Sequence, residues 1–430
     1  MRRRHIKSWV FAGGERYCSL VDRETGMPLF LPSIYTTLEV RNRGLSFAAM
    51  EAALTAINIS MDFANEYEID LEHRFQKREF LAPHECEALK DHCLRHLRDE
   101  DAACNVQEIA SGKKGYKRPR KKVKSATQRG RLTGIATYLE WIAKYLLTRS
   151  LDSDASKGIE AMKKAILSRR PKARHRNKTE IPKGLSKEQE ELLWSIVAPG
   201  SKRNPFDGAA TQARNELAVH MLGHLGSRGG ELLNLQVGDI DFAKGFLNIY
   251  RRADAPGDTR RNQPLVKTLA RTIAIAPELA DAIRAYVVDF RKKTPNSSSH
   301  GYLLVVHKSG PTLGQPLSKQ GLQYVCRQIA ATDPTLKGFR AHVLRHTWND
   351  RFSEKMDKSE KPVTPEEQEQ RREYQMGWNQ GSGTAKVYNQ RFIQRKSNET
   401  SREMQTESHQ RALAAKAKAE GTGAGDSTSV

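Results

Sequence analysis

Cysteine is scarce in this chain, which has only five in 430 residues. An odd number of scattered cysteines in a long chain argues against a disulfide framework, so we expect reduced thiols. Residues 84–104 do bring cysteines and histidines together, but without a paired C-x-x-C, and the segment is interpreted as a charged helix. Zinc binding is the weaker alternative there; its ligands would come from His84, Cys86, His92, Cys93, His96 and Cys104.

Long apolar runs are also missing. No stretch approaches the roughly 20 residues that span a bilayer. The opening segment, MRRRHIKSWVFAGGERYCSL, lacks the apolar core of a signal peptide. We therefore expect a soluble, cytoplasmic protein with no membrane partner.

The motifs of several common chemistries are absent too. The chain has no G-x-x-x-x-G-K-[ST] loop and no G-x-S-x-G, and GHLGSRGG lacks the glycine spacing of a dinucleotide site. A metal-dependent nuclease needs clustered carboxylates, whereas Asp239 and Asp241 lie on a predicted strand with no evident partner. We expect neither a cofactor nor a metal.

Positive charge, in contrast, is abundant. With 72 Lys and Arg against 50 Asp and Glu, the formal charge is +22, which favours a polyanionic partner such as nucleic acid. Two basic tracts, 113–124 and 169–178, lie beside helical segments, where they could neutralise DNA phosphates. Alternatively, either tract could be a solvated loop, and the first could be a nuclear localisation signal. The candidate DNA-binding residues are Lys117, Arg118, Arg120, Lys121, Lys122, Arg170, Lys172, Arg174 and Arg176.

Hydrophobic spacing predicts a mainly α fold with a small antiparallel β-sheet. Ser46 is a plausible N-cap for a helix that carries Phe47, Met50, Leu54, Ile57 and Met61 at helical spacing. Further helices are predicted at 82–100, 127–149, 186–197, 211–225 and 277–293, with strands in GDIDFAKGFLNIY and RTIAIA. Pro182 and Gly184 mark a linker. The predicted organisation is an N-terminal extension (1–40), a helical domain with a basic linker (41–178), a second domain (183–392) and a partly disordered tail (393–430).

Four stretches of the C-terminal half carry the clearest functional signal: GHLGSRGGELLNL, VKTLARTIAIAPEL, HVLRHTW and MGWNQGSGTAKVYNQRF. Their order, Arg, Lys, H-x-x-R, then Trp before Tyr, resembles the tyrosine recombinase (phage integrase) family over about residues 185–390. The resemblance implies a helical core-binding domain and a catalytic domain. It assigns catalytic positions to Arg228, Lys267, His342, Arg345, Trp378 and the nucleophile Tyr388, with Glu231 in support.

The chemistry of these residue types agrees with that assignment. Planar guanidinium groups such as those of Arg228 and Arg345 match the nonbridging oxygens of a phosphodiester transition state. Tyr388, with a pKa of about 10 in free solution, needs a cationic neighbour or His342 to lose its proton, and Lys267 could protonate the departing 5′-hydroxyl. Trp378 could donate its indole N–H or simply pack beneath the site.

Each residue also has a plainer interpretation. Arg228 could brace its helix through Glu231, Lys267 could be a surface lysine, and the His342 and Arg345 segment could be a core boundary. His346 and Arg271 receive no catalytic role. Trp378 precedes Tyr388 by ten residues where the family usually has nine, which predicts a one-residue insertion in NQGSG. The charged stretch 354–375 is interpreted as a solvated insertion.

The resemblance implies an enzyme that cleaves and rejoins double-stranded DNA through a 3′-phosphotyrosyl intermediate, without metal or nucleotide, as a homotetramer on two recombination sites. It favours integration or excision of a mobile element, with possible accessory DNA-binding proteins. Two alternatives remain at this stage: a DNA-binding protein of the same fold without catalysis, and a type IB topoisomerase-like enzyme that relaxes DNA.

Overall fold

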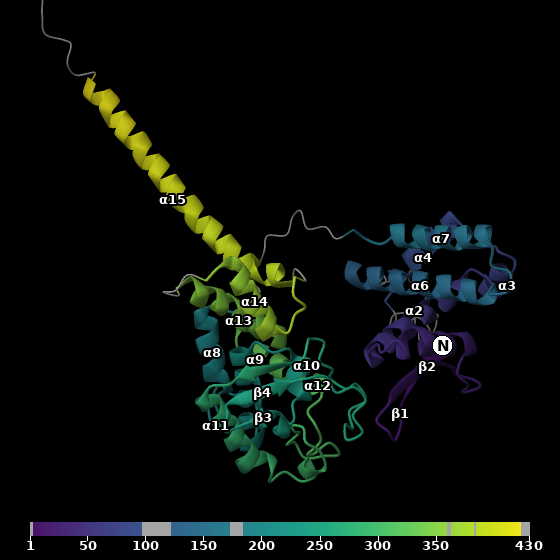
Figure 1. The fold of residues 1–430 in the computed structure, drawn as a ribbon, viewed down its shortest axis with the longest axis horizontal. Coiled ribbons are helices and arrows are strands. Elements are labelled where there is room, and N and C mark those ends of the chain that lie inside the picture. Colours follow the sequence, from purple (N-terminus) through teal and green to yellow (C-terminus); the bar gives the residue numbers. More distant parts are fainter. Residues whose placement is uncertain (1–2, 97–121, 173–183, 359–362, 382–383, 423–430) are drawn as a thin grey trace, which may run out of the picture. The chain divides into compact units, whose positions relative to one another are not determined.

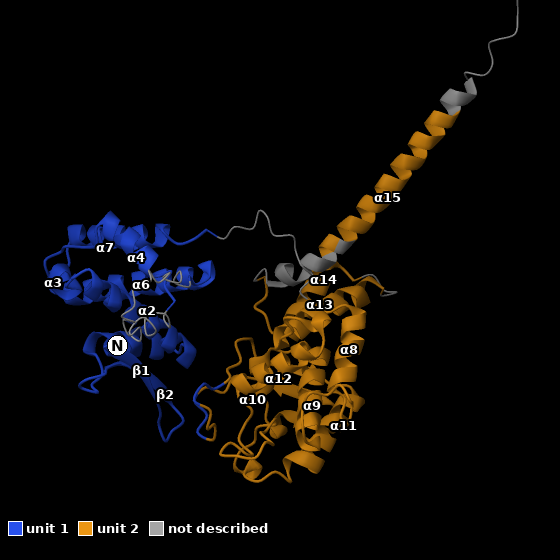
Figure 2. Cartoon of the chain, turned by 180° about the vertical axis from the view of Figure 1, so that it is seen from behind, with its two compact units in different colours: residues 1–178, 254–256, 261–263 blue, residues 179–253, 257–260, 264–430 orange. Residues whose placement is uncertain are grey.

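The structure is a computed structural model that describes residues 3–96, 122–172, 184–358, 363–381 and 384–422; for 384–392, 395 and 418–422 it describes the backbone alone. The chain divides into two compact units (Figure 2). Unit 1 comprises residues 1–178 with 254–256 and 261–263. Unit 2 comprises 179–253, 257–260 and 264–430.

Unit 1 combines an N-terminal β-hairpin with a set of helices (Figure 1). The hairpin strands pair antiparallel, with Arg4 opposite Asp22 and Val10 opposite Arg16. The sequence assigned residues 1–40 to an N-terminal extension and predicted no hairpin there. The elements are β1 (Arg4–Val10), β2 (Arg16–Asp22), α1 (Phe30–Tyr35), the π-helical η1 (Thr36–Arg41), α2 (Phe47–Glu66), α3 (Leu71–Gln76), α4 (Pro83–His92), α6 (Ser125–Leu146) and α7 (Ser153–Ser168).

Helix α2 is at the centre of unit 1 and begins where the sequence predicted. The Ser46 hydroxyl accepts a hydrogen bond from the backbone N–H of Ala49 at 3.3 Å, which satisfies one of the unpaired donors of the first turn. Met50, Leu54 and Ile57 are fully buried against the inner face of α6. The predicted amphipathic helix is confirmed.

Residues 3–40 contribute to the same core. Cys18 and Leu20 of β2 are fully buried, and Leu31, Tyr35 and Val40 belong to the hydrophobic cluster that α2 and α6 form. These residues, which the sequence assigned to an extension, therefore help to build unit 1. The hairpin is anchored by Arg4, which donates to Asn58 at 3.1 Å and to Asp62 at 2.7 Å.

Unit 2 surrounds a three-stranded antiparallel sheet, in the order β3-β4-β5, with helices. Strand β5 alternates strictly, with Arg271 and Ile273 buried and Thr272 and Ala274 exposed, as a half-buried strand requires. Its elements are α8 (Lys187–Val197), α9 (Ala209–Leu225), α10 (Gly229–Asn234), η3 (Val237–Asp239), β3 (Ile240–Asp241), β4 (Phe246–Ile249), β5 (Arg271–Ala274), α11 (Pro277–Ala285), η4 (Tyr286–Arg291), η5 (Ser297–Ser299), α12 (Lys319–Thr332), η6 (Pro334–Leu336), α13 (Ala341–Asp357), α14 (Pro365–Met376) and α15 (Thr384–Thr422).

The mainly α class with small antiparallel sheets is confirmed, and so are the predicted helices at α8, α9 and α11. Asp239, however, lies in η3 and not on a strand, and it is paired. It accepts hydrogen bonds from the Tyr250 hydroxyl at 2.8 Å and from Arg252. The expectation that it lacks a partner was wrong.

The end of unit 2 also differs from expectation. The charged stretch read as a solvated insertion forms the end of α13 and helix α14, which packs one face inward through the buried Arg372 and Glu373. Helix α15 begins beside α13 and α14 (Figure 1) and continues to Thr422, further than the sequence suggested. Residues 423–430 lie outside the described residues.

Within the described ranges, no helix is both long and apolar enough to cross a bilayer. The same ranges hold no group of three or more His, Cys, Asp or Glu side chains placed to bind a metal ion. Of the cysteines in the proposed zinc segment, Cys86 and Cys93 are buried and free, and Cys104 lies outside the described residues.

Because the two units have separate hydrophobic clusters, a core cavity in one should destabilise that unit first. We expect Leu54→Ala to lower the free energy of unfolding of unit 1 by about 2–5 kcal/mol, measured as faster amide hydrogen exchange in α2 and α6. The matched control is Leu151→Ala, since Leu151 is exposed. Equal acceleration in α8 and α9 would contradict this independence.

Candidate active site

The candidate site begins at the N-terminus of α10, where Arg228 is the N-cap residue. Arg228 donates its backbone N–H to Glu231 Oε2 at 3.1 Å, and its guanidinium lies 3.6 Å from Glu231 Oε1. Gly226 just before it has φ +60°, and a Cβ there would lie 2.8 Å from Met376 and from Trp348. The Arg228 side chain remains 28% exposed, while its Nη1 atom is buried without a hydrogen-bond partner among the described residues, so the guanidinium is partly open to solvent.

Glu231 connects Arg228 to strand β5. It accepts a hydrogen bond from Thr268 at 2.7 Å and forms an ion pair with Arg271 at 2.9 Å in which both side chains are 1% exposed. Burial alone would raise the pKa of Glu231, but the positive charges of Arg271 and Arg345 outweigh it, so the pKa is lowered. Glu231 is therefore a buried anion among arginines.

Arg345 is fully buried within α13. It donates to the carbonyl oxygen of Gly226 at 2.9 Å and to that of Met376 at 3.0 Å. Its guanidinium carbon lies 5.3 Å from the centre of the Trp378 ring, a cation–π distance. Arg345 thus links the turn before Arg228 to the segment that carries Trp378.

Residues 375–377 expose three successive carbonyl oxygens, and a different element holds each. Arg271 donates to the carbonyl of Gln375 at 2.8 Å, Arg345 to that of Met376, and the backbone N–H of Leu269 to that of Gly377 at 3.0 Å. Gly377 has φ +64°, and a Cβ there would lie 2.5 Å from Arg271. Only glycine fits this close approach without strain, and the result is a fixed position for Trp378.

Lys267 and His342 flank the same place. Ala341, the residue before His342, lies 3.6 Å from a Cβ built on Gly229. The carbonyl oxygen of Leu265, two residues before Lys267, lies 3.0 Å from a Cβ built on Gly230. Both segments therefore pack close to the first turn of α10. Both side chains are exposed. Lys267 lies in the irregular segment before β5 and not on the strand. His342 packs edge-on against His346 with ring centroids 4.8 Å apart.

The structure thus brings Arg228, Arg345 and Trp378 together around Glu231, and the segments that carry Lys267 and His342 lie next to α10. Trp378 is buried and packs with Met376 and Trp348, consistent with the packing interpretation of its ring. Tyr388, the sixth predicted catalytic residue, lies on the first turns of α15, but its side chain is outside the described residues.

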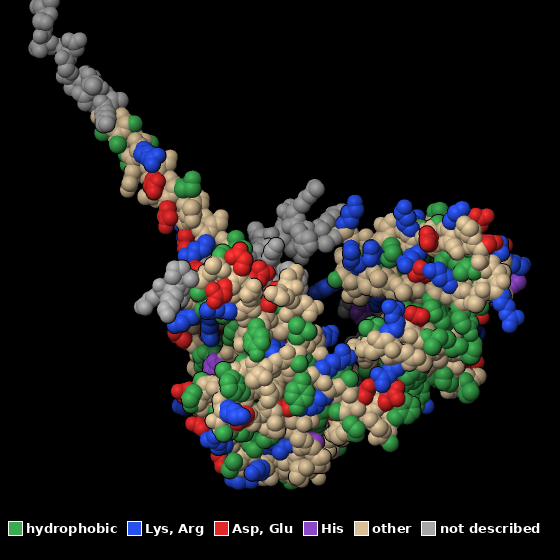
Figure 3. Space-filling model, in the orientation of Figure 1, with side chains coloured by type: hydrophobic (Ala, Val, Ile, Leu, Met, Phe, Trp, Pro, Cys, Tyr) green, Lys and Arg blue, Asp and Glu red, His purple; other side chains and the backbone are tan. Residues whose placement is uncertain are grey.

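The candidate DNA-binding residues are described in part. Lys122 and Lys172 are exposed, and Arg170 is half-buried, donating to the carbonyl of Leu167 at 3.0 Å. Lys and Arg side chains also gather over α7 on the visible face of unit 1 (Figure 3). The remaining candidates, Lys117, Arg118, Arg120, Lys121, Arg174 and Arg176, lie outside the described residues.

Sequence reasoning missed Arg271 and Thr268. Arg271 was given no role, yet it holds both Glu231 and the Gln375 carbonyl. The alternation in RTIAIA contained the signal: if Ile273 and Ile275 point inward, so does Arg271. A charged residue on the inner face of a strand requires a buried partner, and Glu231 is the acidic residue already placed at the site.

The lowered pKa of Glu231 makes a prediction about acid stability. A carboxylate whose pKa is lower in the folded than in the unfolded state stabilises the fold above the unfolded value, about 4.3. That contribution is lost as the pH falls through the folded-state pKa. We expect Glu231→Gln to be about 3–5 kcal/mol less stable than wild type at pH 7, because it leaves buried arginine charge unpaired. This difference in the free energy of unfolding should become smaller towards pH 3.

Urea unfolding of the two proteins between pH 7 and pH 3 measures this gap. Glu191→Gln serves as the control, since Glu191 is an exposed glutamate of α8. A gap that stays constant over the whole range would show that Glu231 is not a stabilising anion.

Residues 185–359 match the sequence model described as the phage integrase family. Among curated proteins, the tyrosine recombinase XerD of Halalkalibacterium halodurans is 28% identical over 206 residues, covering 48% of this chain and 56% of that protein. The tyrosine recombinase XerC of Staphylococcus epidermidis is 24% identical over 173 residues, covering 39% and 47%. The chain thus spans about half the length of the curated relatives it matches.

Solved structures give weaker likenesses. The XerA recombinase is 14% identical, with 83% of this chain and 92% of that chain covered and a TM-score of 0.33. The XerH recombinase bound to its difH substrate is 15% identical, with 64% and 81% covered and a TM-score of 0.36.

Proposed function

Because residues 185–359 belong to the phage integrase family, we propose that this chain is a tyrosine-type site-specific DNA recombinase. The observation that carries the proposal is the convergence of Arg228, Arg345 and Trp378, from α10, α13 and the end of α14, around the buried Glu231. A site built of fixed cations suits a reaction in which negative charge grows on phosphate oxygens.

In the proposed reaction, the Tyr388 oxygen attacks the scissile phosphate. A 3′-phosphotyrosyl bond forms as the bond to the 5′-oxygen breaks. The partly exposed guanidinium of Arg228 contacts a nonbridging oxygen directly. Arg345 is buried, so its positive charge acts on the phosphate from the interior of the protein. It contacts the phosphate directly only when the site opens around it. The energy of the broken bond is kept in the phosphotyrosyl link, and a free 5′-hydroxyl from another strand reverses the step on a new partner.

Two exposed side chains would handle the protons. His342, near the N-terminus of α13, accepts or shares the proton of the Tyr388 hydroxyl. Lys267 protonates the departing 5′-oxygen, a poor leaving group without it. Both residues are solvent-exposed on the structure, as groups that meet a DNA strand must be.

We propose that unit 1 takes part in binding the DNA duplex together with unit 2. Lys122, Arg170 and Lys172 of unit 1, with the basic tracts they belong to, neutralise backbone phosphates and release counterions, so binding weakens as salt rises. A homotetramer on two sites, as the family resemblance implies, then exchanges strands pairwise, with accessory DNA-binding proteins as possible partners. The name XerD of a relative refers to a tyrosine recombinase; for this chain we propose integration or excision of a mobile element at the nucleoid.

The proposed nucleophile is tested with nicked DNA that carries the native recombination site. Wild-type protein should give a covalent protein–DNA adduct on a denaturing gel, and Tyr388→Phe should give none, because phenylalanine has no oxygen to attack phosphorus. Tyr374→Phe is the matched control, since the Tyr374 hydroxyl donates to the carbonyl of Thr272 and is exposed.

An adduct that persists in Tyr388→Phe would assign the attack to another tyrosine. DNA binding without any adduct in wild type would favour a non-catalytic DNA-binding protein. Adduct formation with relaxation of plasmids that lack a specific site would favour a type IB topoisomerase-like enzyme.

The C-terminal helix is proposed to join copies on DNA. Beyond Ile393, α15 carries exposed side chains, among them Met404 and Leu413, and one ion pair ties it to α13, between Lys396 and Asp357 at 3.6 Å. Ending the chain at residue 394 should abolish the slower gel-shift bands of multiple copies while keeping the single-copy band. Lys396→Ala, which removes the ion pairs with Asp357 and Glu399 and keeps the helix, is the control. Assembly unchanged by the truncation would contradict the role.

A further inference from the structure

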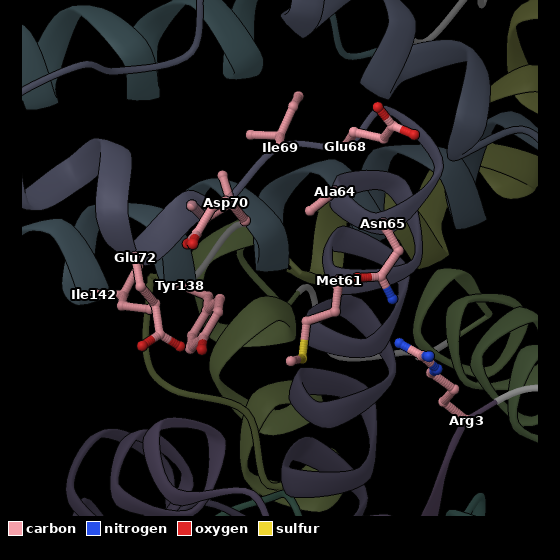
Figure 4. Close-up of a pocket in the computed structure, with 11 residues that line it drawn as sticks. Arg3, Met61, Ala64, Asn65, Glu68, Ile69, Asp70, Glu72, Tyr138 and Ile142 are labelled. Carbon is pink, nitrogen blue, oxygen red and sulfur yellow. The ribbon is translucent and has the colours of Figure 1, made fainter.

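Unit 1 contains a cavity of about 470 Å³ that the proposed recombination chemistry does not use. It lies between the last turns of α2, the α2–α3 connection and α6 (Figure 4). Met61, Ile142 and the ring of Tyr138 supply an apolar wall. Glu68, Asp70 and Glu72 place three carboxylates around it. The volume is that of a small-ligand or peptide-anchor pocket.

The carboxylates outnumber the basic residues at the cavity, because Arg3 is the basic side chain among the residues that line it (Figure 4). Within the described residues, neither Glu68 nor Glu72 has an ion pair, and the hydrogen bond of Asp70 is the cap on the backbone N–H of His73 at 3.0 Å. This occurs in a chain with 72 Lys and Arg. Partial burial, together with the charge of Asp70, raises the pKa of Glu72. The pocket is thus an acidic site on a strongly basic protein.

Tyr138 is the second sign of a ligand. The residue is 97% buried, being 3% exposed, and it lines the cavity. Its ring is fixed by Tyr35 at 5.2 Å and Trp141 at 6.3 Å, but its hydroxyl makes no hydrogen bond with any described residue. The hydroxyl can both donate and accept a hydrogen bond, so a ligand N–H in the cavity could pair with it.

Glu68 has an unfavourable backbone conformation. Its φ is +53°, in the left-handed region where glycine is preferred. The conformation closes α2, with the N–H of Glu68 directed at the carbonyl of Asn65 at 3.4 Å. Glu68 lines the edge of the cavity with an exposed side chain, whose carboxylate points away from Glu72 and Tyr138 (Figure 4).

We propose that this pocket binds an arginine- or lysine-bearing segment of a second copy of the chain. The aliphatic stem of such a side chain packs on Met61, Ile142 and Tyr138, and its charged head meets the Glu72 carboxylate and the Tyr138 oxygen. Glu68 adds negative charge at the edge of the cavity. The inference rests on the proposed function, in which several copies bind one DNA. Two copies of a +22 chain repel each other, and an acidic site that takes up a basic side chain reduces this repulsion at their contact.

The ligand chemistry is tested first, with the full-length protein and a fluorescent pentapeptide that alternates glycine and arginine. The control peptide has citrulline in place of arginine, which keeps the shape and removes the charge. Fluorescence anisotropy should show saturable binding of the arginine peptide alone. Glu68→Gln with Glu72→Gln should weaken it about tenfold, and Tyr138→Phe about threefold, the loss of one hydrogen bond.

The matched control is Glu24→Gln with Glu160→Gln, which removes the same charge from exposed positions of unit 1 outside the pocket. Thermal unfolding of every variant checks that the fold is retained, and the two neutral substitutions keep side-chain size. Equal binding of both peptides, or binding unchanged in the pocket variants, would overturn the site.

The identity of the occupant is tested on a random-sequence duplex long enough for several copies. Mass photometry should show wild-type copies binding cooperatively, and the pocket variant binding one by one, with single-copy affinity unchanged. Peptide binding combined with unaltered cooperativity would overturn the second copy as occupant and assign the pocket to a basic segment of another protein. Neither measurement depends on cleavage, so failure of the Tyr388 adduct leaves both results interpretable.

Discussion

A single buried carboxylate, that of Glu231, holds the parts of the candidate active site together. It lies close to Arg228 and Arg271 and within electrostatic reach of Arg345, which come from three separate elements. Removing charges from water is expensive unless they are compensated, so each arginine near Glu231 depends on the others staying in place. Arg228 therefore projects towards solvent from a fixed base, the preorganisation that stabilisation of a phosphate transition state demands.

The buried arginines also hold backbone carbonyl groups of the site in place. Arg271 and Arg345 each have more than one partner, and between them they hold Glu231, the turn at Gly226 and the carbonyls of Gln375 and Met376. Strand β5, helix α13 and the end of α14 are tied to one another by these two side chains. Helix α14 is thus a structural part of the site, although most of its residues are charged and it resembles a solvated segment in sequence.

The sequence predicted those parts in which local pattern and final environment agree. Helices α2 and α9 have apolar residues at helical spacing, and the H-x-x-R pair stands out by residue type. The N-terminal hairpin was missed because its pattern does not alternate: β1 buries Arg4 through Asn58 and Asp62, and β2 buries four successive residues from Cys18 to Val21. Arg271 was missed because its partner lies 40 positions away in the chain. The nucleophile role of Tyr388 stays a prediction.

The backbone of Glu68 bears on how this protein would respond to engineering. A residue at φ +53° costs free energy that glycine would not, so a search for heat-resistant variants would be drawn to this position. Such variants would lose a carboxylate at the edge of the acidic cavity, while the free energy of unfolding of each isolated molecule increased. A screen that scores single molecules and one that scores assemblies on DNA would therefore rank the same substitution in opposite order.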